Sequence, residues 1–550
     1  MKQARPYIIT GVVIILLLIL KLNTLSESFG SVDEFRGANL KEDIFYPLIA
    51  RSINDEKRLN VKLDGQDVKK EFGEVHVGQD KSILFSLDFV RDKLNVSAFY
   101  SGDNKATVLY NGTNTKLDLL SEDTIDYVRA DDICKIIGYT VDANFETLEV
   151  NINSNHNKST LPDKFDLRDY GRVAEAMNQG SDTTCWAYAS ILALESSVIP
   201  KKADFDVDDM IAFNGEVSQN NAGGAFTNAL AYLLSWNGPI YKNSGAIKLS
   251  GNDKDIAKHV QEARFYTHND REDIKWAVYK FGGVSTSIHA NVSSSNLNSS
   301  NYYNPETNSY CYDGVNGPNH EITIIGWDDN YPAANFGVPV RGDGAFICQN
   351  SWGKAFGENG VFYVSYYDTN IGSQAVSYSR IYEPGYYDNI YQSDLCGWKG
   401  QLGYGQSNAF AANVYTAKSG EKLRSIGLYA IDKNASVNVY LVRNYKDTDN
   451  LKEREQVASA TFEEAGFYTI ELDNPVELQS GEKFAILIDI RVPNVLRPVA
   501  MEYIVSDADK NVKVDDGEGY ISRDGITWES VEEKANGNLC LKAYTTNMGV

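Results

Sequence analysis

Apolar residues in the middle of the chain follow helical spacing. They recur at this spacing from Trp186 to Val198, and two good capping residues, Thr183 and Thr184, stand just before the run. The pattern therefore predicts a helix whose start holds Cys185. A second helix is expected over residues 228–236.

Further along, the pattern changes to short apolar runs typical of strands. These runs cover residues 283–290, 321–327, 344–348 and 360–367. Residues 161–382 are therefore predicted to form an α+β domain, helical in its first half and built from strands in its second half.

The last region alternates apolar and polar residues. Turn residues separate the predicted strands, which cover residues 422–430, 435–442, 466–472 and 483–490. Many short strands at regular spacing are typical of a β-sandwich, so we expect one over residues 386–548.

A small α+β domain is predicted before the central one, over residues 56–153. Strands are expected at 61–65, 82–85, 106–112 and 147–152. A helix is expected over 127–139, stopped by Gly138. A polar segment, residues 153–160, then separates this domain from the central one.

The first 28 residues are basic, then apolar, then polar. Lys2 and Arg5 precede an apolar run from Tyr7 to Leu20. This arrangement predicts a signal peptide or an uncleaved signal anchor, and the weak cleavage site after Lys21 favours the anchor. Positive charge before the run predicts that the rest of the chain is exported. Residues 29–55 are expected to be a linker or a pro-segment.

Composition narrows the class of partner. The chain has 52 basic and 75 acidic residues, a formal charge of −23, which argues against nucleic acid as a partner. Six cysteines in 550 residues do not make a disulfide scaffold. Cys396 and Cys540 lie near the two ends of the last domain, and a disulfide between them is left open.

Cys185 is the first candidate for chemistry. At a helix N-terminus the helix dipole lowers a thiol pKa and favours the nucleophilic thiolate. The competing interpretation is a buried cysteine used only for packing. His320 and Asn350 follow Cys185 by 135 and 165 residues, and Gln179 precedes it by six. The order Cys, His, Asn is that of a nucleophile, a base and an orienting amide.

These four residues and their surroundings resemble the papain-like cysteine peptidases. Residues 161–168 resemble the start of the mature enzyme, and residues 221–226 resemble the Gly-Gly segment that pairs with the substrate backbone. The resemblance implies a two-lobed papain-like fold that works without a cofactor or metal. It also implies site residues, which are catalytic Cys185, His320, Asn350 and Gln179, and substrate-binding Gly223, Gly224 and Trp352. Trp352 matches the tryptophan that shields the Asn–His hydrogen bond.

The flanking domains carry weaker resemblances. Residues 127–152 are similar to the stalk domain called copper-amine-oxidase N-terminal-like, and no metal-binding set is visible there. Residues 386–394 resemble the start of the lectin-like domain of clostridial cell-surface proteases. Exposed tyrosines and acidic residues of that domain are candidates for binding carbohydrate or Ca²⁺. Solvated strand faces are the alternative.

The sequence thus predicts an exported cysteine endopeptidase that acts on extracellular or cell-envelope proteins. It is expected at the outer face of the membrane, or secreted if the N-terminal segment is cleaved. One alternative is a surface adhesin or carbohydrate-binding protein with an inactive peptidase domain. Another is an exopeptidase, with the inserted segment 328–344 as a candidate blocking loop. His289, the rival base, is expected to be structural or to line a pocket.

Overall fold

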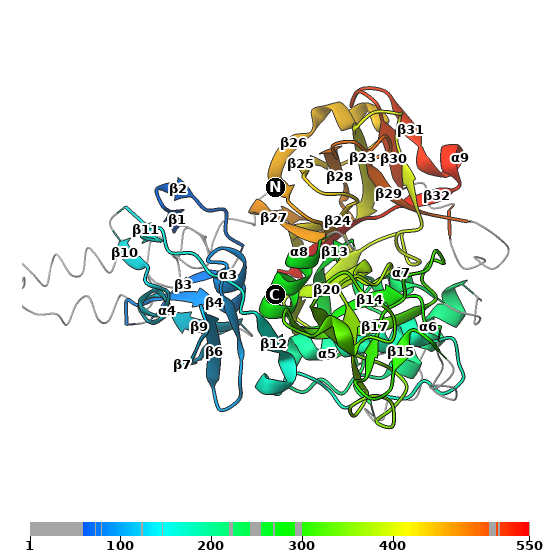
Figure 1. Cartoon of the computed structure of the whole chain (residues 1–550). Coiled ribbons are helices and arrows are strands. Elements are labelled where there is room, and N and C mark those ends of the chain that lie inside the picture. Colours follow the sequence, from blue (N-terminus) through cyan, green and yellow to red (C-terminus); the bar gives the residue numbers. More distant parts are fainter. Residues whose placement is uncertain are drawn as a thin grey trace, which may run out of the picture.

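The structure is a computed structural model (Figure 1). It describes residues 59–71, 73–78, 80–122, 125–145, 147–218, 224–242, 255–267, 270–291, 300–504, 513–514 and 518–548. The predicted signal segment 1–28 and the predicted linker 29–55 lie outside these residues. Within them, no helix is both long and apolar enough to span a membrane.

Residues 59–153 form a small α+β unit with its own hydrophobic core. Its elements are β1 (Asn60–Leu63), β2 (Gln66–Asp67), β3 (Val75–Val77), β4 (Ile83–Ser86), α3 (Leu87–Asp92), β5 (Ser97–Tyr100), β6 (Lys105–Tyr110), β7 (Thr113–Asp118), β8 (Leu120–Glu122), β9 (Ile125–Arg129), α4 (Ala130–Ile137), β10 (Thr140–Asn144) and β11 (Glu149–Asn153). They form three small sheets.

The helix expected over 127–139 is shorter than predicted. Residues 127–129 belong to strand β9, which pairs with β4, and helix α4 starts only at Ala130. Cross-strand pairing of these residues overrides their local helical pattern. The predicted stop is confirmed, because Gly138 ends α4 with φ of +73°, a left-handed conformation that favours glycine.

The central region is α+β, as predicted. Its elements are β12 (Lys164–Asp166), η2 (Leu167–Tyr170), α5 (Cys185–Val198), α6 (Val207–Ser218), α7 (Phe226–Leu234), β13 (His259–Tyr266), α8 (Arg271–Lys280), β14 (Val284–Ile288), β15 (Tyr303–Asn304), β16 (Ser309–Tyr310), β17 (His320–Asp328), η4 (Ala333–Asn335), β18 (Ala345–Gln349), β19 (Val361–Ser365) and β20 (Ser373–Tyr382). Helices α5, α6 and α7 pack on one side, and the strands from β14 to β19 form the other.

The last region is built from two large sheets and a smaller sheet of three strands, and the alternating pattern predicts such a β-rich domain. Its elements are β21 (Asn389–Tyr391), β22 (Gly400–Leu402), β23 (Asn408–Thr416), β24 (Glu421–Ala430), β25 (Ala435–Arg443), η5 (Thr448–Glu453), β26 (Glu455–Phe462), β27 (Ala465–Leu478), β28 (Lys483–Arg491), β29 (Val499–Tyr503), β30 (Gly519–Ser522), β31 (Trp528–Ser530), α9 (Val531–Ala535), β32 (Gly537–Leu539) and β33 (Leu541–Asn547). Apolar residues from all three sheets meet in one core.

The central and last regions share a continuous sheet. Strand β13 pairs with β20 on one side and with β27 on the other, where Ala263 lies opposite Phe467. The strand order β17-β14-β20-β13-β27-β24-β33 therefore runs from the central region into the sandwich. This pairing joins the sandwich to the central region.

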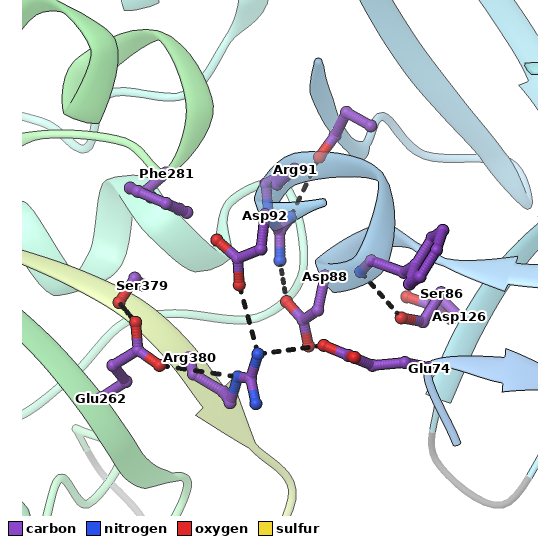
Figure 2. Close-up of polar contacts among 12 residues, drawn as sticks. Glu74, Ser86, Asp88, Arg91, Asp92, Asp126, Glu262, Phe281, Ser379 and Arg380 are labelled. Atoms are coloured by element: carbon purple, nitrogen blue, oxygen red, sulfur yellow. Dashed lines mark hydrogen bonds and ion pairs between the residues drawn. The ribbon is translucent and has the colours of Figure 1, made fainter. Parts of the chain in front are cut away.

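The N-terminal unit is attached to the central region through buried ion pairs (Figure 2). Arg380 on β20 lies 3.1 Å from Glu74 and 3.2 Å from Asp92, and both acids belong to the N-terminal unit. Arg264 on β13 also pairs with Asp92, at 2.9 Å. The side chains of Arg380 and Glu74 are only 7% and 4% exposed. The unit is therefore firmly docked.

Candidate active site

Cys185 is the first residue of helix α5, as predicted. Its helix packs against strands β14, β17 and β20, and most of its residues are buried. The thiol accepts a hydrogen bond from the backbone N–H of Glu321, the residue that follows His320 in β17. The fold therefore brings Cys185 from the helical side next to the start of β17.

His320 and Asn350 are in direct contact. His320 opens β17, Asn350 follows β18, and these two strands pair. The Nε2–H of His320 donates to Asn350 Oδ1 at 2.9 Å, and the backbone N–H of Ser351 donates to the same oxygen at 2.8 Å. The amide thus binds Nε2, and Nδ1 of the imidazole takes no part in this hydrogen bond.

Trp352 covers this pair. Its ring stacks on the imidazole of His320, with centroids 4.8 Å apart and planes 25° apart. Phe356 holds the indole edge-on from another side, at 4.9 Å. His320 is 7% and Asn350 1% exposed, so water has little access to their hydrogen bond.

Gln179 is tied to the same segment by both backbone and side chain. Its backbone N–H donates to the carbonyl of Ser351 at 2.8 Å, and its Oε1 accepts a hydrogen bond from the Ser351 hydroxyl. Its Nε2 donates one hydrogen to the carbonyl of Asp182 at 2.6 Å. These contacts fix the direction of the amide, and the second Nε2 hydrogen remains for a ligand.

Burial controls the pKa values of Cys185 and His320. It raises the pKa of the Cys185 thiol, against the backbone N–H groups of Glu321, Trp186 and Cys185, which lower it. The lowered pKa expected from the helix N-terminus alone is therefore wrong for this chain. Burial also lowers the pKa of His320 to about 4, against the hydrogen bond to Asn350. Both shifts favour the neutral form of each group.

The Gly-Gly segment is described only in part. Gly223 lies outside the described residues. Gly224 packs directly on the indole of Trp186, where an added Cβ would come within 2.6 Å of Nε1. Glycine at this position therefore lets the backbone pass close to helix α5.

His289 contacts the loop that leads to His320. Its Nδ1 lies 2.8 Å from the carbonyl of Gly317, and its ring packs on Tyr312. His289 therefore holds a loop, in agreement with a structural role.

The inserted segment 328–344 lies at the wrong end of its hairpin to block the site. His320 and Asp328 are the two ends of β17, and Asp328 pairs with Ala345 at the start of β18. Eight residues of strand span about 26 Å. Tyr331 and Phe336 of this segment pack in a separate small core. The exopeptidase interpretation thus loses its candidate loop.

Possible metal ligands and the cysteines bear on two further expectations. Across the described ranges, no group of three or more His, Cys, Asp or Glu side chains is arranged to hold a metal ion. All six cysteines are described and none forms a disulfide, so the pairing of Cys396 with Cys540 is not made.

Two further polar residues at the site escape sequence reasoning. Ser351 orients the Gln179 amide. The only sign of this role in the sequence is that Ser351 follows Asn350 directly. Glu321 is an acidic residue inside an otherwise apolar strand run, and it is buried beside Cys185. An acid at that position was visible in the sequence, but only the fold shows its surroundings.

The arrangement defines a papain-like cysteine peptidase domain followed by a lectin-like domain. Residues 161–379 match the model of the papain family cysteine protease, and residues 390–545 match that of the lectin like domain. The chain therefore contains a papain family cysteine protease domain. Mouse cathepsin S is 28% identical over 218 residues, which are 37% of this chain and 59% of cathepsin S. The chain thus spans about three-fifths of this curated relative.

Two solved structures share the fold across both domains. One is a variant of the clostridial cysteine protease Cwp84 after propeptide cleavage, with a TM-score of 0.61 and 24% identity over 70% of this chain and 99% of that one. The other contains the cysteine protease and lectin-like domains of Cwp84, a surface layer associated protein of Clostridium difficile. Its TM-score is 0.60, with 23% identity over 71% of this chain and 90% of that one.

Proposed function

We propose that the chain is an exported cysteine endopeptidase whose catalytic residues are Cys185, His320, Asn350 and Gln179. The observation that carries the proposal is the set of contacts that brings Cys185, His320 and Asn350 together. The thiol lies beside the residue after His320, and Asn350 holds His320 through Nε2. A half-buried nucleophile, a base and an orienting amide in this relation are what acyl transfer needs.

The reaction starts with proton transfer from the Cys185 thiol to Nδ1 of His320. The thiolate attacks the carbonyl carbon of the scissile peptide bond, and the free Nε2 hydrogen of Gln179 and the Cys185 N–H stabilise the oxyanion. His320 then returns the proton to the leaving amine, and a thioester remains on Cys185. Water, deprotonated by His320, attacks the thioester, and the Cys185 thiolate leaves as the acid product forms.

Gly223, Gly224 and Trp352 are proposed to bind the substrate. In this proposal the segment with the two glycines pairs with the peptide backbone. Trp352 additionally keeps water from the Asn350–His320 hydrogen bond, a role supported by its stacking on the imidazole.

Protein hydrolysis by the purified full chain tests the proposal. We expect cleavage of casein and of mixed peptides, and Cys185→Ala should lower the rate at least about 10⁴-fold. Cleavage at internal peptide bonds, read by mass spectrometry, distinguishes an endopeptidase from an exopeptidase. Undiminished cleavage by Cys185→Ala would overturn the catalytic assignment. A folded wild type that cleaves nothing would instead favour the adhesin alternative.

Extracellular or cell-envelope proteins are the proposed substrates, and the outer face of the membrane is the proposed location. The apolar run from Tyr7 to Leu20 supports membrane anchoring, and similarity to a surface layer associated protein supports the cell surface. Protease accessibility in intact cells, together with N-terminal sequencing of the released protein, tests both.

The lectin-like domain is proposed to bind cell-wall carbohydrate, with Ca²⁺ as the other candidate ligand. Support comes from the match of residues 390–545 to the lectin like family. A glycan array and a calcium titration of the full chain test the two ligands separately.

A further inference from the structure

Glu321 is a buried acid directly beside the nucleophile. It follows His320 in β17 and is 7% exposed. Its backbone N–H donates to the Cys185 sulfur, and the charge of its carboxylate acts on the same thiol. The mechanism above gives this carboxyl no role.

The carboxyl lacks a counter-ion within the described part of the chain. It accepts a hydrogen bond from the backbone N–H of Phe226, the first residue of α7. Its Oε2 is buried and meets no hydrogen-bond donor among the described residues. No described lysine, arginine or histidine contributes to its pKa, which burial raises to about 8. Such an acid is costly to keep, because a buried charge needs a partner.

The carboxyl lies next to the proposed substrate-binding segment. Glu321 is paired across the sheet with Ser287 of β14, whose hydroxyl donates to Gln374 Oε1 at 3.2 Å. The Phe226 N–H that it binds comes directly after Gly224 and Ala225, on the proposed substrate-binding segment. The carboxyl therefore lies beside the segment that is proposed to pair with the substrate backbone.

Local structure alone does not account for an acid at this position. Binding one backbone N–H of α7 requires only an oxygen acceptor, which glutamine supplies equally. A carboxyl can in addition ionise, and the positive charge that would stabilise its ionised form is missing from the described neighbours. A substrate side chain that ends in an ammonium or guanidinium group would supply it.

We propose that Glu321 selects a basic side chain, Lys or Arg, at one position on the N-terminal side of the scissile bond. This inference rests on the proposed peptidase function and names a preference of the same site. On binding, the Glu321 carboxyl gives its proton to solvent and pairs with the substrate cation, which replaces the missing counter-ion.

The test uses the full chain and a fluorogenic peptide library in which each of the four residues before the scissile bond is varied in turn. We expect the wild type to prefer Lys or Arg over Leu at one position. Glu321→Gln keeps the shape and the acceptor, and should lower the basic-to-Leu ratio of kcat/KM by at least about 30-fold, which corresponds to about 2 kcal/mol.

A matched control exists in helix α5. Glu195 is likewise buried, at 3% exposed, and likewise accepts one backbone N–H, from Phe205 at 2.9 Å. It lies ten residues along the helix from Cys185, or about 15 Å. Glu195→Gln should leave the basic-to-Leu ratio unchanged.

The outcomes are distinct. A wild type that cleaves the library without a basic preference at any position overturns the inference and leaves the peptidase proposal standing. The same holds if Glu321→Gln folds, is active and keeps the wild-type ratio. A wild type that cleaves no member of the library overturns the peptidase proposal and the inference with it. If Glu321→Gln does not fold, the wild-type profile alone decides.

Discussion

Replacement of Arg380 by methionine should release the N-terminal unit from the rest of the chain. Arg380 is the arginine that pairs with buried Glu74, and it also pairs with Asp92. Methionine keeps much of the volume but removes the charge. Asp92 keeps Arg264 as a partner, whereas Glu74 loses the arginine that partly offsets its burial.

The size of the effect follows from this burial. Breaking a buried ion pair by removing one partner costs about 3–5 kcal/mol. Because Asp92 keeps a second arginine and Glu74 can neutralise by taking up a proton, we expect the lower end, about 3 kcal/mol. This corresponds to about a hundredfold weaker association of the unit.

The assay is the dissociation constant between the two parts after cutting the linker. A specific protease site placed within residues 154–158 allows the cut, and analytical gel filtration measures association of the fragments. Wild-type fragments should stay together, and those of Arg380→Met should separate. Lys354→Met is the control, because Lys354 pairs with Glu175 at the surface, where both side chains are more than half exposed, and it should change nothing.

Two results would refute this reasoning. Wild-type fragments that separate freely would show that the buried ion pairs do not hold the unit. Arg380→Met fragments with the wild-type dissociation constant would show that Arg380 does not contribute.

Three further predictions concern the site. Gln179→Ala should lower kcat about 10²–10³-fold without preventing the reaction of Cys185 with an alkylating inhibitor. Ser351→Ala should show part of the same loss, because it frees the Gln179 amide. Stopped-flow kinetics with one substrate measures both variants, and wild-type kcat in either one would contradict the role of that residue. Because burial holds the pKa of His320 at about 4, the acid limb of the kcat/KM profile should lie near pH 4, and a limb near 6.5 would contradict this. The pKa of Glu321 is about 8 in the folded chain and ordinary in the unfolded chain, so the folded state holds the extra proton and stability falls as pH rises from about 4.5 to 8. In urea unfolding, Glu321→Gln should flatten this fall by at most about 1.4 kcal/mol per pH unit. The same pH dependence of stability in Glu321→Gln and the wild type would contradict this prediction.

The position of the N-terminal unit bears on how activity is controlled. Lys201, just after α5, pairs with Asp126 of the unit at 2.6 Å, and Ser197 and Ile199 line a cavity shared with it. Helix α5 has 14 residues, so these contacts lie about 20 Å from Cys185. We therefore predict that cutting the linker leaves the specific activity of the wild type unchanged, and a large gain on cutting would contradict this prediction.

Local patterns were sufficient for the elements that carry the site. Helical spacing after Cys185 predicted α5 almost to the residue, and the apolar run after His320 predicted β17. These elements are long and strongly patterned, so their local signal agrees with the fold.

Local patterns could not predict contacts between segments that are distant in the sequence. The pairing of β13 with β27, which joins the central sheet to the sandwich, depends on two strands about 200 residues apart, and neither carries a signal for its partner. Strand β9 replaced the first turn of the predicted helix for the same reason, because β4 lies next to it.

Electrostatics at the site also needed the fold. The sequence predicts a lowered thiol pKa from the position of Cys185 at a helix start, but burial by the surrounding strands outweighs the helix. The surroundings of Glu321 depend likewise on Phe226, which lies 95 residues earlier in the chain.

The central claim is that Cys185 is a nucleophile activated by His320. Intact-mass spectrometry of the full chain after reaction with an epoxysuccinyl inhibitor tests it most directly. The account predicts one adduct per chain, located on Cys185 by peptide mapping, strongly slowed in His320→Ala and absent in Cys185→Ala. No adduct on the folded wild type, or an equal rate of labelling in folded His320→Ala, would contradict it.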